Sequence, residues 1–142
     1  MIVQSFLASF LASAGFGVLF NVPKKAVVAG GIAGMTGWVL FTGLADGYGL
    51  NPVLATAIAS YVVAELSHVL AKIYKMPVIV FSAAGIIPLV PGGLAYQTMR
   101  LLVSSDYNAA IGLASRVFLI SGAIAFGLVM AGVAAQLFLK KI

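Results

Sequence analysis

The chain has 142 residues, of which 63% are hydrophobic and 8% are charged, and its formal net charge is +5. A water-soluble domain with so few polar side chains does not cover its surface, so the composition indicates a polytopic membrane protein. The basic residues stand in pairs at the ends of apolar segments, a pattern that sets membrane orientation and argues against nucleic-acid binding. With no cysteine and one histidine in the chain, we expect no metal site and no cofactor.

Five apolar segments each approach the ~20 residues that cross a hydrocarbon core about 30 Å thick. The segments are residues 2–21, 26–45, 52–71, 77–99 and 110–139. The last is longer than a straight span requires, so we expect it to tilt or to begin in the interface. The sequence therefore predicts an all-α polytopic helical bundle of about five transmembrane helices, with residues 1–142 forming a single transmembrane domain.

The positions of the basic residues predict the orientation of the spans. Pairs of lysines follow the first, third and fifth segments: Lys24 and Lys25, Lys72 and Lys75, and Lys140 and Lys141. The other two connections carry acidic residues, Asp46 and Asp106. The positive-inside rule then places the N-terminus outside and the C-terminus on the cytoplasmic side. We expect the membrane to be a bacterial inner membrane.

Small residues recur every four positions in three of the segments, which lets helix backbones approach closely. They are Ser9, Ser13 and Gly17 in the first, Gly30, Ala33, Gly34 and Gly37 in the second, and Ala123, Gly127, Ala131 and Ala135 in the fifth. The simpler interpretation is packing within the bundle. The alternative is that some of these faces meet a second subunit.

Two ionisable residues lie inside the third segment, where Glu65 and His68 are three positions apart and Lys72 follows on the same face. An intramembrane carboxylate beside an imidazole is suited to taking up and releasing a proton, so both are candidates for proton coupling. The structural alternative is an ion pair in which Lys72 extends to the cytoplasmic surface and neutralises Glu65.

The fourth segment is interrupted in its middle by Pro88, Pro91, Gly92 and Gly93. Proline removes a backbone donor, so a helix that begins at Pro77 should end near Ile87 and restart after the Pro-Gly-Gly. Unwound backbone at membrane depth is tolerated where protein buries it or water solvates it, and transporters place substrate sites at such breaks. The alternative is a proline kink that only shapes packing.

The restarted half-helix has features that suit an anionic ligand. Its first N–H groups and the positive end of its dipole favour a carboxylate, and Tyr96 and Gln97 lie one turn further on. Arg100 near its end and Arg116 in the last segment are candidates for attracting an anion, although Arg116 also fits a topological anchor.

The stretch IIPLVPGGLAY from Ile86 to Tyr96 resembles the signature of the threonine/serine exporter family, and GVLFNVPKK from Gly17 to Lys25 resembles the end of the first span in the same proteins. A chain this short is similar to the small subunit of the split, two-component members. The resemblance implies proton-driven export of threonine and serine, or of a dicarboxylate such as succinate, together with a larger homologous membrane partner. It implies a transporter and not an enzyme.

Two rival functions remain open at this stage. One is a homo-oligomeric pore or exporter that needs no partner. The other is an assembly subunit that carries no substrate site of its own.

Overall fold

A computed structural model describes residues 2–139, and over this range the chain forms helices and no strands. The expected all-α helical bundle is confirmed. The elements in chain order are α1 (Ile2–Leu19), α2 (Lys24–Thr42), the π-helical turn η1 (Gly43–Gly47), α3 (Pro52–Tyr74), α4 (Val78–Gly85), the 3-10 turn η2 (Ile87–Leu89), α5 (Gly92–Val103) and α6 (Tyr107–Leu139).

Local sequence explains where α3 begins and ends. The Asn51 side chain accepts a hydrogen bond from the Val53 N–H at 2.9 Å, and Pro52 occupies the first helical position. At the other end, Lys75 adopts a left-handed conformation with φ of 54° and its N–H bonds the Ala71 carbonyl. The same conformation at Asn21, with φ of 60°, follows α1. At both residues the left-handed conformation ends the helix and lets the chain change direction.

The helices of the body meet through small side chains. Helix α2 packs against α1, α3 and α4, while α6 packs against α3 and α5. The expected small-residue faces are confirmed as buried contact faces: Ser9, Ser13 and Gly17 on α1, Gly30, Ala33, Gly34 and Gly37 on α2, and Ala123, Gly127, Ala131 and Ala135 on α6.

The fourth apolar segment is broken as the prolines predict. Helix α4 ends at Gly85, two residues before the expected end, because the chain tightens into η2 ahead of Pro88. Helix α5 begins at Gly92 and is bent by 55° from the preceding part. Within the described residues, four helices are long and apolar enough to cross a membrane, or up to five if this bent pair counts as one span.

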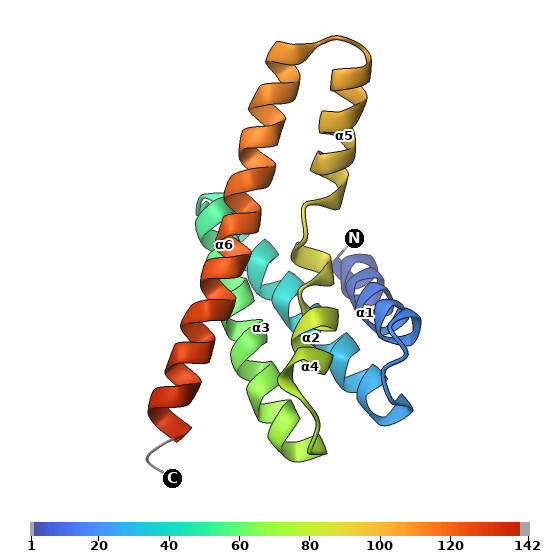
Figure 1. Ribbon diagram of the computed structural model, residues 1–142, viewed down its shortest axis with the longest axis vertical. Helices are drawn as coiled ribbons and strands as arrows, with labels where there is room; N and C mark the ends of the chain where they lie inside the picture. Colours follow the sequence, from blue (N-terminus) through green and yellow to red (C-terminus); the bar gives the residue numbers. More distant parts are fainter. Residues whose placement is uncertain (1, 140–142) are drawn as a thin grey trace.

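Figure 1 shows two regions of the molecule. Helices α1 to α4 and the C-terminal half of α6 form the body, and α5 with the N-terminal half of α6 projects from it as a hairpin. The α1–α2 and α3–α4 connections lie at the same end of the body as the last turn of α6 (Figure 1). Lys24 and Lys25 begin α2 next to the first connection, Lys72 lies in the last turn of α3, and Lys75 follows α3. Lys140 and Lys141 lie outside the described residues.

Candidate functional site

The break leaves backbone donors open at the start of α5. The Gly92 N–H bonds the Val90 carbonyl at 2.8 Å, and the Ala95 N–H bonds the Pro91 carbonyl at 3.0 Å. Pro91 occupies the N-cap position, where no side chain caps the helix. Among the described residues, the N–H groups of Gly93 and Leu94 therefore have no acceptor. Two adjacent donors at the positive end of a helix dipole can bind a carboxylate.

A cavity of about 280 Å³ lies beside this helix start. Residues from α2, α3, η2, α5 and α6 line it together with the unwound backbone at the break, and it is partly open to the surface. We call it the break cavity; its lining residues are Trp38, Phe41, Thr56, Pro88, Leu89, Val90, Pro91, Gly93, Leu94 and Ile120. Thr56 lines the cavity and is buried, and its hydroxyl donates a 2.7 Å hydrogen bond to the Pro52 carbonyl, which leaves its oxygen able to accept one. The wall is otherwise mostly apolar.

The predicted substrate-binding residues differ in their position relative to the break cavity. Pro88, Pro91 and Gly93 line the break cavity. Gly92 adjoins it without lining it, and no atom lies within 4 Å of the position where a Cβ on Gly92 would stand. Tyr96, which is 71% exposed, and Gln97 lie on the outer surface of α5.

Sequence reasoning missed the far wall of the cavity, which Trp38, Phe41, Thr56 and Ile120 supply. These four come from three helices whose mutual arrangement has no signature in the sequence. One of the four could have been singled out from the sequence: Trp38 is the single tryptophan of the chain and stands among the glycines and alanines of α2.

The two arginines proposed to attract an anion lie on the projecting hairpin. Arg100 on α5 and Arg116 on α6 are both exposed. Neither lines the break cavity. Asp106, at the tip of the hairpin, accepts a hydrogen bond from the Ala109 N–H at 3.4 Å and so caps the start of α6.

The proton-coupling candidates lie on α3, away from the break. Glu65 and His68 are both half-buried, and Glu65 is nine residues beyond Thr56, about 13 Å along the helix. The Glu65 carboxylate is paired with the hydroxyl of Tyr61, one turn earlier. Over residues 2–139, neither His68 nor Lys72 forms an ion pair with Glu65.

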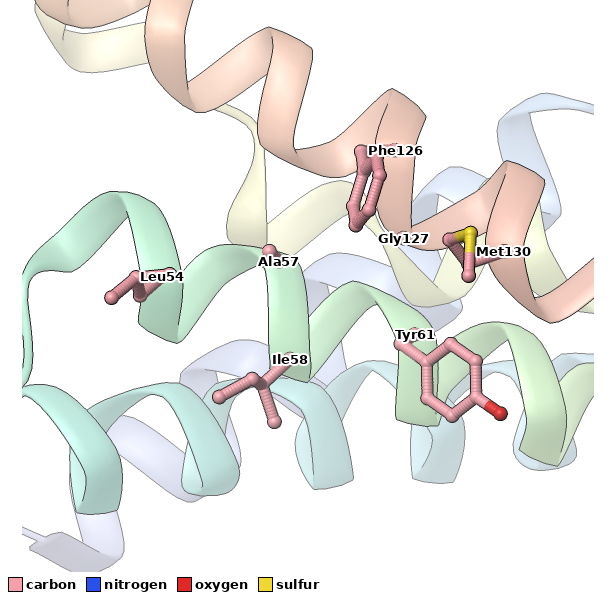
Figure 2. A pocket seen from close by; sticks show the side chains of 7 residues that line it. All are labelled: Leu54, Ala57, Ile58, Tyr61, Phe126, Gly127 and Met130. Carbon is pink, nitrogen blue, oxygen red and sulfur yellow. The ribbon is translucent and has the colours of Figure 1, made fainter.

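Tyr61 also borders a second, apolar groove of about 420 Å³ between α3 and α6 (Figure 2). The α6 backbone approaches α3 closely here, since a Cβ on Gly127 would stand 2.8 Å from the Ala57 carbonyl oxygen. In Figure 2 the Tyr61 ring lies along the side of α3, and its hydroxyl extends away from the other labelled side chains.

Comparison with known proteins identifies the family of the chain. A family model described as "Threonine/Serine exporter, ThrE" matches residues 5–134, nearly the whole chain. The chain belongs to the threonine/serine exporter family. The description of the family names an exporter, and the four helices of residues 2–139 that are long and apolar enough to cross a membrane agree with a multi-pass membrane protein.

One relative is a Haemophilus influenzae protein carrying the name "Uncharacterized protein". It is 32% identical over 139 residues, which cover 92% of this chain and 46% of the relative. The chain thus spans about half the length of that relative. No solved structure matches the chain.

Proposed function

We propose that the protein is the small membrane subunit of a proton-coupled exporter of small carboxylate-bearing metabolites. The substrates are threonine and serine, or a dicarboxylate such as succinate. The observation that carries the proposal is the break cavity, where the open N–H groups of Gly93 and Leu94 start a half-helix at the wall of a partly open cleft. A substrate carboxylate docks on these two donors.

The volume of the break cavity sets the size of the substrate. A space of about 280 Å³ is of the size that a small metabolite fills. The Thr56 oxygen is an acceptor for an ammonium or hydroxyl group of the substrate.

A larger homologous subunit is expected to complete the exporter. The relative from Haemophilus influenzae has more than half of its length outside the region matched here, and we propose that a second chain supplies the counterpart of that region. The outer surface of α5 exposes Gln97 and Arg100 among apolar side chains, and these two polar groups agree with a protein neighbour on this side. Positive charge at one end of the body supports a cytoplasmic position for that end and an outer position for the N-terminus.

Proton coupling is assigned to Glu65, with His68 one turn away. Glu65 is the one acidic residue of the sequence inside a membrane-spanning helix, since Asp46 and Asp106 lie at the ends of helices. An acidic residue inside a membrane-spanning helix is a candidate functional residue by default. Over residues 2–139, no basic side chain forms an ion pair with Glu65.

The proposal is tested by transport in liposomes. The chain is purified with its co-expressed larger subunit and reconstituted, and the efflux of labelled threonine, serine and succinate is measured with and without a pH gradient. We expect efflux of at least one substrate that a pH gradient accelerates and that neither subunit supports alone. Equal transport by this chain alone would favour a homo-oligomeric exporter. Absence of transport for all three substrates would contradict the proposal.

A further inference from the structure

A second, shallower hollow borders the break cavity at Trp38 and Pro88. It measures about 250 Å³ and lies between α1, α2 and η2, and we call it the α1 hollow; its lining residues are Ser5, Ala8, Ser9, Ala12, Trp38 and Pro88. The two spaces have different walls, because the α1 hollow is lined by α1 and the break cavity by α3, α5 and α6. They share only Trp38 and Pro88.

We infer that the Trp38 side chain, backed by the Pro88 ring, is the partition between these two spaces and controls what passes from one to the other. The inference rests on the proposed function, because it treats the break cavity as the substrate site. It adds a route: substrate moves between the break cavity and the α1 hollow when the indole swings aside.

The backbone around Trp38 is fixed, so the side chain is the part able to move. Gly34, one turn before Trp38, lies against Ser13 of α1, where a Cβ would coincide with the Ser13 hydroxyl. Gly37 lies against α3, where a Cβ would stand 2.5 Å from Val63 Cγ2. Helix α2 is therefore held on both sides at this level. The indole itself is only half-buried and packs on Phe41 with ring centroids 5.5 Å apart.

The indole also offers a polar group to the substrate. The indole N–H can only donate a hydrogen bond. In the described part of the chain, no residue accepts a hydrogen bond from it. The α1 hollow contributes the hydroxyl of Ser9, a buried residue that donates to the Phe6 carbonyl at 2.9 Å and keeps its own oxygen as an acceptor. A small molecule with both a carboxylate and a donor group finds partners on both sides of the partition.

The partition can be tested directly because the chain contains no cysteine. Ser9→Cys places a thiol in the α1 hollow and Thr56→Cys places one in the break cavity. The intact complex, with any partner cysteines replaced, is treated with a short bis-maleimide, and the intrachain link is detected by mass spectrometry. With Trp38 present we expect no link. With Trp38→Ala we expect the two thiols to be joined.

Phe41→Ala is the matched control. Phe41 is an aromatic neighbour that lines the break cavity and not the α1 hollow, so its removal enlarges one space without joining the two. Trp38→Leu serves as a second variant if Trp38→Ala does not assemble. Links in the parent or equally in Phe41→Ala, or no link in either Trp38 variant, would overturn the partition.

Transport gives a second readout on the same variants. We expect Trp38→Ala to raise efflux without a pH gradient by about tenfold, as loss of a gate predicts. Phe41→Ala should weaken substrate affinity without this leak. A parent complex that transports none of the three substrates would overturn the proposed function, whereas the crosslinking result decides the partition independently.

Discussion

The hydroxyl of Ser13 on α1 occupies the place that a Cβ on Gly34 of α2 would fill. Ser13 is fully buried, and within residues 2–139 its hydroxyl has no hydrogen-bond partner. The Pro88 ring lies beside the same point, 3.4 Å from that Cβ position. One crossing of α1 and α2 therefore sets the position of the first proline of the break.

Gly34→Ala should destabilise the complex by about 1–3 kcal/mol, because the added methyl group overpacks the contact with Ser13. The measurement is thermal unfolding in detergent. Gly15→Ala on α1 is the control, since no atom lies within 4 Å of its Cβ position. Adding Ser13→Gly to Gly34→Ala should recover most of the loss. Equal stability of Gly34→Ala and the parent would contradict the close contact.

Gly93→Leu should abolish substrate binding by filling the break cavity, which Gly93 lines. Gly92→Leu is the matched control, since Gly92 is adjacent in the sequence but does not line the cavity. Binding is measured on the intact complex in detergent with amino acids and dicarboxylates. Equal loss in both variants would show that side-chain bulk at the start of α5 acts through folding and not through the cavity.

Replacing Pro88 and Pro91 together with Ala should let α4 continue into α5. The N–H groups of Gly93 and Leu94 then enter ordinary helical hydrogen bonds, and the donors for a carboxylate disappear. We expect loss of binding with no loss of thermal stability, because a continuous helix satisfies its own backbone. Full affinity in this double variant would mean that the break only shapes packing.

Glu65→Gln should remove the pH dependence of export while the protein still assembles with its partner. His68→Ala should shift the pH profile without removing transport. Tyr61→Phe, which removes the hydroxyl paired with Glu65, should retain pH-dependent export with an altered midpoint. All three are measured as efflux over a range of pH in liposomes. An unchanged profile in Glu65→Gln would assign coupling elsewhere.

Lys24→Cys and Asp46→Cys, at opposite ends of α2 and η1, should be labelled from opposite sides of the membrane. An impermeant thiol reagent applied to intact cells should reach position 46, and position 24 only after permeabilisation. The cysteine-free chain gives a clean background. Labelling of both positions from outside would refute the predicted orientation.

The sequence predicted what depends on local chemistry. Apolar length gave the spans, spacing of small residues gave the buried faces of α1, α2 and α6, and Pro88 and Pro91 gave the break. It did not predict the far wall of the cavity, because Trp38, Thr56 and Ile120 meet only through the packing of three helices. It grouped Tyr96 and Gln97 with Gly93, and all three are exposed on one face of α5, where the i, i+3 and i+4 spacing places them together.

Helix α6 joins the two regions of the molecule as one continuous segment from Tyr107 to Leu139, about 50 Å long. Its C-terminal half packs on α3, its N-terminal half packs on α5, and Ile120 between them lies in the wall of the break cavity. A partner that tilts the exposed hairpin would therefore move Ile120 relative to the cavity wall on α2 and α3. The volume available to substrate then depends on how a partner holds the hairpin, although the hairpin lies outside the cavity.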